Sequence, residues 1–239
     1  MSVNFNSTQG VGAMQLGSMD LETALLAVQN QRSQLLESQL KGQIDAVQAK
    51  NDEIAKMNEG MNASQTQLGK VEAQIPLNEA KIQELTAMRD QLTEVKNRDP
   101  NGWTGLSWGW AGDDKAQSQT MLQRVRAEGL TDRGAAPRDV DGNGTMDAHG
   151  TTVGGWIDQL NAKIDALKTE TTSLKQEQSD LKSSIAETKS SIDSLSNSQQ
   201  MDMLRLQSLS NKRNEAFDVM TNFIKKMQDS RSSILGNMR

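Results

Sequence analysis

A seven-residue repeat of apolar side chains runs through the first half of the chain. Apolar residues at two positions of a sustained heptad are typical of helices that wrap around one another as a coiled coil. The repeat consists of Leu40, Val47, Ile54, Met61, Leu68, Ile75 and Ile82, accompanied by Met57, Val71, Leu85 and Leu92. It predicts a first coiled-coil helix over residues 20–98, capped at its start by Ser18 or Asp20 and ended before Pro100.

A second repeat of the same period occupies the other half. Its members are Leu160, Leu167, Leu174, Leu181 and Leu195, with Ile157, Ile164, Ile185, Ile192 and Leu206. These residues predict a second coiled-coil helix and C-terminal assembly helix over residues 153–239. Because both helices need an apolar partner, we predict an all-α fold. The expected architecture is a long antiparallel coiled-coil hairpin with a small irregular insert domain at its tip.

Pro76 is the serious interruption of the first repeat. A proline inside a helix removes one hydrogen bond and clashes with the preceding turn. The apolar repeat nevertheless passes from Ile75 to Ile82 without losing phase. We therefore expect a kink or a short break at Pro76, with both segments on the same seam.

Residues 99–152 differ in composition and predict a small head, with a short helix from about residue 116 to 128. The segment holds three of the four tryptophans, namely Trp103, Trp108 and Trp110. Tryptophan is the largest apolar side chain available to so small a unit, so we expect this cluster to form its core. An exposed aromatic contact surface is the alternative.

Composition narrows the class of protein further. The 239 residues include three Phe, no Tyr and no Cys, so the core must consist mostly of Leu, Ile, Val and Met. Without cysteine, disulfides and thiolate metal sites are excluded. No stretch approaches the ~20 apolar residues of a membrane span, so none is expected. Residues 1–19 lack the features of a cleaved secretory signal, and their Ser, Asn, Gln and Gly content predicts disorder in the free chain.

Charge and candidate catalytic groups argue against two functional classes. The net charge is −5 with the signs interspersed, whereas nucleic-acid-binding proteins normally carry a basic patch. His149 is the only histidine, which excludes a histidine-dependent serine triad. The carboxylates fall on solvated helix faces, and no glycine-rich phosphate loop is present. We therefore identify no catalytic residues and expect a protein that is not an enzyme.

One segment, from Asp139 to Gly150, has a pattern suited to a hard cation. Carboxylate or amide oxygens at alternate positions, followed by a glycine at a tight turn, can surround Ca²⁺. The predicted ligands are Asp139, Asp141, Asn143 and Asp147, with the backbone carbonyl of Thr145. The twelve residues resemble the calcium loops of the EF-hand and dockerin families. Gly150 stands where those families have an acidic ligand, and the alternative is an Asx-rich turn without metal.

The two ends of the predicted hairpin carry more apolar surface than a two-helix seam requires. Surplus apolar surface on a helix usually meets another partner. The predicted assembly interface consists of Leu21, Leu25, Val28, Leu35, Leu36, Phe217, Met220, Phe223, Ile224, Met227 and Ile234. Neighbouring subunits would cover these side chains, and the alternative is that residues 1–18 fold over them.

The final segment, from Asn211 to Arg239, resembles the C-terminal helix of bacterial type III secretion proteins that assemble beyond the needle. These are the EspA-type filament and needle-tip proteins, which share this layout of a polar N-terminus, a long helix, an insert and a long C-terminal amphipathic helix. The resemblance implies a secreted virulence protein that forms a helical homo-oligomer outside the bacterial cell. It also implies the secretion needle, an export chaperone and translocator proteins as partners. A calcium-binding coiled-coil interaction module and a cytoplasmic adaptor are the alternatives.

Overall fold

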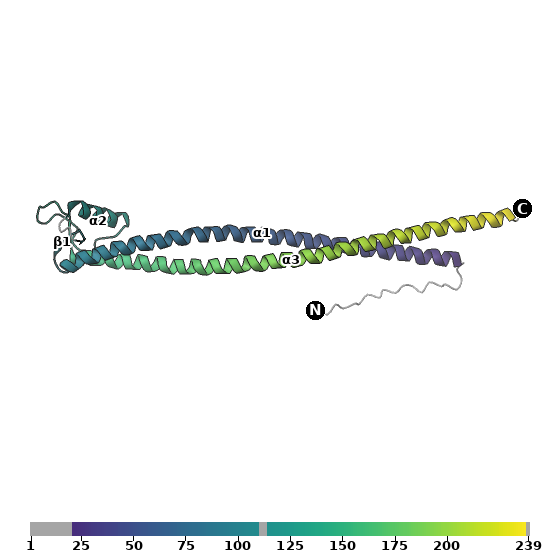
Figure 1. Cartoon of the computed structure of the whole chain (residues 1–239), viewed down its shortest axis with the longest axis horizontal. Coiled ribbons are helices and arrows are strands. Elements are labelled where there is room, and N and C mark those ends of the chain that lie inside the picture. Colours follow the sequence, from purple (N-terminus) through teal and green to yellow (C-terminus); the bar gives the residue numbers. More distant parts are fainter. Residues whose placement is uncertain (1–20, 110–113, 238–239) are drawn as a thin grey trace. The chain divides into compact units, whose positions relative to one another are not determined.

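Two long helices and a short irregular segment between them make up the described part of the chain (Figure 1). The computed structural model describes residues 21–109 and 114–237. In chain order the elements are α1 (Leu21–Arg98), β1 (Trp103–Gly105), α2 (Lys115–Ala127), β2 (Asp147–His149) and α3 (Gly150–Asn237). The predicted all-α class is confirmed, whereas the expectation for residues 1–19 lies outside the described residues.

The helices belong to two compact units, each built from a stretch of α1 and a stretch of α3. Within the described residues, unit 1 contains residues 21–60 and 188–237, and unit 2 contains residues 61–109 and 114–187. The head between the long helices is therefore part of unit 2.

The long helices run antiparallel, as two ion pairs of unit 2 show. Glu79 of α1 pairs with Lys175 of α3 at 2.8 Å, and Glu72 pairs with Lys182 at 3.0 Å. The residue number on α3 rises as the number on α1 falls. The predicted helical hairpin is thereby confirmed.

Apolar side chains from the predicted heptads fill the seam of unit 2 and continue into the head. Removing such side chains from water is the main favourable contribution to folding. The buried cluster contains Leu85, Met88, Leu92 and Val95 of α1, Leu106, Met121, Val125, Leu130 and Ala148 of the head, and Val153, Trp156, Leu160 and Ile164 of α3. The hairpin and the head thus share one core.

The fully buried tryptophan of this core is Trp156 on α3, which lies outside the predicted tryptophan cluster. Trp108 is half-buried and packs against the core. Trp103 is half-buried, and the centroid of its ring lies 4.8 Å from the guanidinium carbon of Arg138. Trp110 lies outside the described residues. The insert therefore does not build its core from its own tryptophans alone, because a helix of the hairpin supplies the central ring.

α1 continues through Pro76, so the expected short break is absent. Ile75 is buried beside it, and the seam keeps its phase as predicted. Pro76 itself is exposed, as is Glu72, whose backbone carbonyl loses its helical partner. Water can satisfy that carbonyl, which explains why the helix tolerates the proline at this position.

A small antiparallel sheet, which the sequence analysis did not predict, closes the head. β1 pairs with β2, with Thr104 opposite Ala148. The backbone N–H of Gly150 donates to the carbonyl of Gly102 at 2.9 Å and extends the pairing. Strands of three residues are too short to show the alternation from which a strand is recognised.

α2 lies close to the predicted short helix. The side chain of Asp114 caps its first turn by accepting a hydrogen bond from the backbone N–H of Gln117 at 2.9 Å. Gly129, with φ of +66°, ends it, because the left-handed conformation favours glycine. Met121 and Val125 direct the inner face of α2 into the core.

α3 begins at Gly150, whereas the predicted start was residue 153. A Cβ atom on Gly150 would lie 2.1 Å from the carbonyl oxygen of Pro100, and one on Gly154 would lie 3.0 Å from Nζ of Lys96. These glycines permit close packing between chain segments. Glycine has a low helix propensity, but tertiary packing overrides that propensity here. The helix therefore begins earlier than predicted.

The seam of unit 1 is less apolar than that of unit 2. Among its described side chains, the buried apolar ones are Leu36, Val47 and Ala216, and the polar side chains of Ser33 and Asp202 are buried as well. The heptad phase is kept, but fewer large apolar groups are removed from water.

Candidate functional site

The predicted metal loop folds around the side chains of its own aspartates. Both oxygens of Asp139 accept backbone hydrogen bonds, from Gly142 at 2.8 Å and from Gly144 at 2.9 Å. Gly142 and Gly144 have φ of +73° and +85°, which only glycine adopts without strain. The carboxylate of Asp141 accepts hydrogen bonds from the backbone N–H of Asn143 at 3.1 Å and from its amide at 2.9 Å.

Hydrogen bonds fasten the loop to the rest of the head. The backbone N–H of Val140 donates to Asp147 at 2.8 Å, and Asp147 is buried. The backbone N–H of Met146 donates to Oγ of Ser118 on α2 at 3.0 Å. Thr145 is also buried, so the second half of the loop belongs to the packed head.

The structure brings together three of the predicted metal ligands. One carboxylate oxygen each from Asp139, Asp141 and Asp147 lies within 4.8 Å of the others. Hard oxygen donors of this kind suit Ca²⁺ or Mg²⁺. The side-chain oxygen of Asn143 instead accepts a hydrogen bond from the backbone N–H of Thr145 at 2.7 Å. The fit is therefore partial, because Ca²⁺ requires about six to eight oxygen ligands.

Two residues at the end of the motif serve other roles. Nδ1 of His149 lies 2.8 Å from the hydroxyl of Thr151, and its ring stands edge-on to that of Trp103. Gly150 forms the first turn of α3. The last position of the calcium-loop pattern is thus used for packing.

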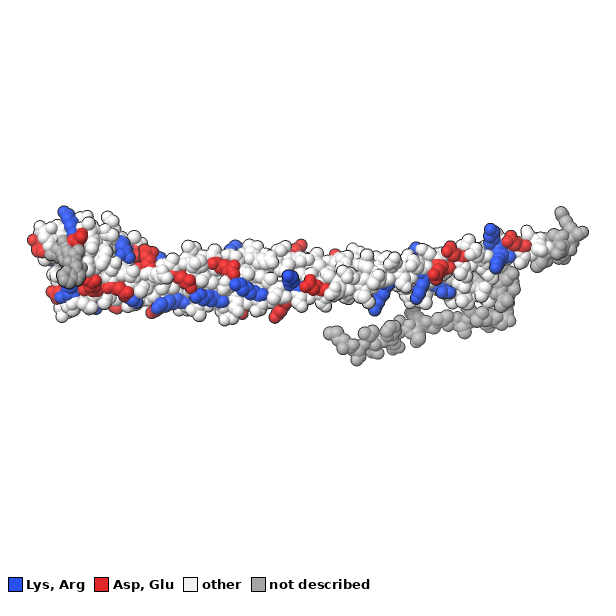
Figure 2. Space-filling view, viewed as in Figure 1, with Lys and Arg blue, Asp and Glu red and all other residues white. Residues whose placement is uncertain are grey.

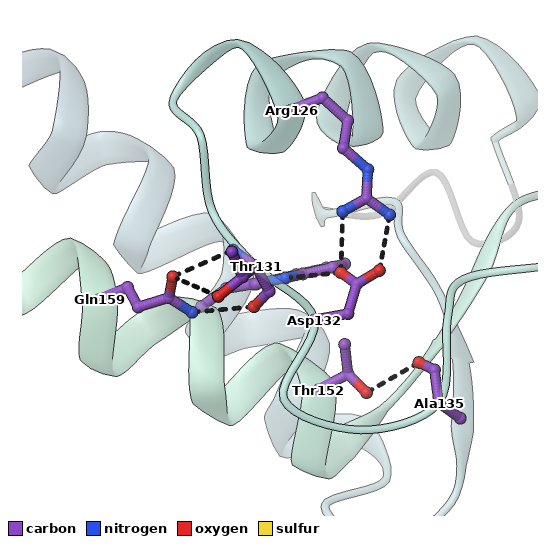
Figure 3. Close-up of polar contacts among 7 residues, drawn as sticks. Arg126, Thr131, Asp132, Ala135, Thr152 and Gln159 are labelled. Atoms are coloured by element: carbon purple, nitrogen blue, oxygen red, sulfur yellow. Dashed lines mark hydrogen bonds and ion pairs between the residues drawn. The ribbon is translucent and has the colours of Figure 1, made fainter.

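A second polar cluster in the head was missed by the sequence analysis (Figure 3). The guanidinium of Arg126 binds both carboxylate oxygens of Asp132, at 2.9 and 2.7 Å. The indole N–H of the fully buried Trp156 donates to the same carboxylate at 3.0 Å. Asp132 therefore joins α2, the loop that follows it and α3.

The same loop is fastened to α3 at two further points (Figure 3). Gln159 accepts a hydrogen bond from the backbone N–H of Thr131 at 3.0 Å and donates its amide to the Thr131 carbonyl at 2.9 Å. The hydroxyl of Thr152 donates to the carbonyl of Ala135 at 2.9 Å. The one sequence signal for these contacts between the loop and α3 is Trp156, since a buried indole N–H needs a hydrogen-bond acceptor.

Charges of both signs are interspersed along the face shown in Figure 2. A hydrogen bond from Lys182 lowers the pKa of Glu72. A hydrogen bond with Glu128, at 2.5 Å, raises the pKa of Lys81. The side chains of Glu72, Lys182 and Lys81 are between 39% and 55% exposed, and ion pairs at the surface contribute little to stability.

The predicted assembly residues are placed unevenly. Leu25, Val28, Leu35, Phe217 and Ile224 are exposed, between 37% and 60%. Leu36 is 9% exposed and lies in the seam. The remaining members are Met220, Phe223 and Met227, which are half-buried, and Leu21 and Ile234, whose side chains lie outside the described set.

Unit 1 holds most of the exposed large apolar side chains of the described chain. Ten of the twelve belong to it, and the two in unit 2 are Leu77 and Val140. The predicted assembly interface did not include Ile44, Met201, Met203, Leu204 and Val219. An apolar residue in the seam and an apolar residue beside the seam look alike in the sequence, so the exposure of these five side chains could not be predicted.

These side chains form two stripes, defined by heptad spacing. The α1 stripe consists of Val28 and Leu35, seven residues apart, with Leu25 beside them. The α3 stripe consists of Met203, Phe217 and Ile224, separated by multiples of seven. Residues spaced by seven lie on one face of a helix, so the members of each stripe share a face of their own helix, with Ser210 between Met203 and Phe217 on α3.

No helix in the described ranges is long and apolar enough to cross a membrane. No family model, curated protein or solved structure matches this chain.

Proposed function

We propose that this chain is a structural subunit that assembles with copies of itself through the apolar stripes of unit 1. The observation that carries the proposal is the concentration of exposed large apolar side chains in that unit. Contiguous apolar surface beyond what a monomer normally exposes marks an interaction site. Unit 2, by contrast, has a large apolar core that is complete within one chain.

The energetic argument is one of magnitude. Burying a large apolar side chain fully contributes about 1.5–3 kcal/mol. The six stripe residues are between 37% and 60% exposed. Covering what remains exposed is therefore worth roughly 1 kcal/mol for each, or several kcal/mol for the six. That is enough to favour association once many copies contact one another.

The specific form that we propose is a bacterial type III secretion filament or needle-tip subunit. It is supported by the resemblance of the segment from Asn211 to Arg239 and by the hairpin layout. In this proposal the protein is secreted and acts outside the bacterial cell. Its partners are the secretion needle, translocator proteins and an export chaperone that binds it before secretion. Identical hairpins joined by heterologous contacts need not close, so a helical array is the expected product.

The experiment compares two aspartate variants of the full-length chain at high concentration. Phe217→Asp with Ile224→Asp places charges on the α3 stripe, and Leu77→Asp places one on a more exposed apolar side chain of unit 2. The wild type and the Leu77→Asp control should form large oligomers in sedimentation and extended arrays in electron microscopy. The stripe variant should remain helical by circular dichroism and sediment as a monomer.

Two results would contradict this proposal. A wild type that stays monomeric at high concentration removes the assembly itself. A Leu77→Asp variant that loses assembly as completely as the stripe variant shows that the surface of unit 1 is not special.

A calcium-binding interaction module is the second candidate, favoured by the three converging carboxylates. In this version Ca²⁺ rigidifies the head, and the coiled coil presents it. Isothermal titration with millimolar Ca²⁺ should give a saturable signal that is lost in Asp139→Ala. A flat trace for the wild type would leave the loop as a hydrogen-bonded turn.

A further inference from the structure

A charged pair lies inside the seam of unit 1. The side chain of Asp202 on α3 is 9% exposed, and that of its partner Lys50 on α1 is 26% exposed. The ion pairs that join α1 and α3 in unit 2, such as Glu72 with Lys182, are about half exposed. The pair in unit 1 therefore differs from the ordinary surface pairs of the coiled coil.

The groups around the pair compensate both charges. The ammonium of Lys50 donates to the carboxylate of Asp202 and to Oγ of Ser198 at 2.7 Å. A hydrogen bond with Gln43 on α1 also lowers the pKa of Asp202, after the larger effect of Lys50. The guanidinium of Arg205, one turn along α3, lies 3.7 Å from the second carboxylate oxygen. Next to this layer, the amide of Gln199 donates to Oδ1 of Asn51.

Within the seam of unit 1, the carboxylate that pairs with Lys50 comes from α3. The seam positions of α1 in unit 1 are Leu26, Gln29, Ser33, Leu36, Leu40, Gln43, Val47, Lys50, Ile54 and Met57, and none is acidic. On α3 the charged seam residues are Asp202 and Arg213. A pairing of α1 with α1 of another copy would offer the Lys50 ammonium no acidic partner within the seam, and desolvating an unpaired charge is costly.

We propose that the Lys50–Asp202 layer is a specificity determinant that restricts unit 1 to the pairing of α1 with α3. An apolar layer would stabilise any pairing of the two helices, whereas a single buried polar layer selects one pairing at a cost in stability. Such selection matters here because both helices carry apolar stripes, which would otherwise favour wrong pairings between copies. This goes beyond the proposed function, since it concerns which helices pair inside unit 1.

The test uses crosslinking, for which a chain without cysteine is well suited. The reporter is Asn51→Cys with Gln199→Cys, joined by a short bifunctional maleimide at a concentration where the wild type sediments as a monomer. The reporter is placed in the original chain and in one with Lys50→Leu and Asp202→Leu. A control reporter, Gln67→Cys with Glu177→Cys, replaces a 3.0 Å hydrogen bond between α1 and α3 in unit 2.

The original layer should give crosslinks within one chain. The leucine variant should melt at the same or a higher temperature, and its share of crosslinks between chains should rise several-fold at the same concentration. The unit 2 reporter should stay intramolecular in both. An unchanged share of intermolecular crosslinks in the leucine variant overturns the proposal.

A second variant covers the case in which leucine disrupts the helices. Exchanging the charges, with Lys50→Asp and Asp202→Lys in one chain, should restore the intramolecular crosslinks that each single reversal loses. Failure of the exchanged pair to do so also overturns the proposal. These readouts are taken on the monomer, so failure of the wild type to assemble would reject the proposed function and leave this inference standing.

Discussion

The carboxylate of Asp132 joins three segments of the head, and its removal tests how that head is held together. Asp132→Ala would leave the indole N–H of Trp156, which is fully buried, without its acceptor. A buried donor left unsatisfied costs about 1–3 kcal/mol. The ion pair with Arg126 is also lost, but the Arg126 side chain is 47% exposed, so this adds no more than about 1 kcal/mol. We therefore expect the variant to lose about 2–3 kcal/mol of unfolding free energy.

The assay is urea denaturation followed by tryptophan fluorescence. All four tryptophans fall between residues 103 and 156, so the signal reports on unit 2. The difference in unfolding free energy follows from the midpoints and the slope of the transition. Arg126→Ala is the matched control, because it removes the ion pair and leaves the bond from Trp156 to Asp132 in place.

The control should lose less than about 1 kcal/mol, and Asp132→Asn, which retains an acceptor oxygen, should fall between the two. Equal losses for Asp132→Ala and Arg126→Ala would refute the reasoning, because they would show that the indole hydrogen bond contributes nothing.

Three further predictions address the core, the glycines and the charged layer. Leu92→Ala, at a fully buried seam position, should lower the unfolding free energy of unit 2 by about 2–5 kcal/mol in urea, whereas Leu77→Ala, at an exposed position, should change it by less than about 0.5 kcal/mol. Gly150→Ala should destabilise the same unit by about 1–3 kcal/mol because its Cβ would meet the carbonyl of Pro100. Gly69→Ala, which meets no atom within 4 Å, should stabilise the helix by about 0.5–1 kcal/mol. The hydrogen bond from Lys50 holds the pKa of Asp202 below its ordinary value, so the stabilising contribution of this carboxylate is complete above the ordinary aspartate pKa and is lost as the pH falls through the lowered pKa. The protection factors of unit 1 amides in hydrogen exchange, corrected for the intrinsic rate at each pH, should fall there, and Asp202→Asn should abolish that pH dependence.

The hairpin was predictable because each seam position repeats the same physical information. Residues such as Leu85 and Leu160 are apolar at heptad spacing over many turns, and no alternative element fits that period. The phase through Pro76 was predictable for the same reason. The break was not needed, because the exposed side of the helix tolerates a missing hydrogen bond.

The head was predictable only in outline. The short helix carries Met121 and Val125 at helical spacing, and it was found. The packing of Trp156 into the head, the bond from its indole to Asp132, and the small sheet all depend on segments that meet only after the chain has reversed. The loop from Asp139 followed its local pattern as far as the turn at Gly144, and then departed where tertiary packing used Gly150 to begin α3.

The position of the head along the chain also bears on the order in which the hairpin forms. The bonds between Thr131 and Gln159 close a loop of 28 residues, whereas Lys50 and Asp202 are separated by 152. The entropy of closing the larger loop first costs about 1.5 kcal/mol more, and its seam offers fewer large apolar groups to offset that cost. Folding should therefore begin in unit 2, where the chain reverses direction, and the pairing of α1 with α3 should then extend toward the chain ends. In pulse-labelling hydrogen exchange, amides of unit 2 should gain protection before those of unit 1. In a chain growing from its N-terminus, the first forty residues of α1 must wait for the last segment to be made before they find their native partner.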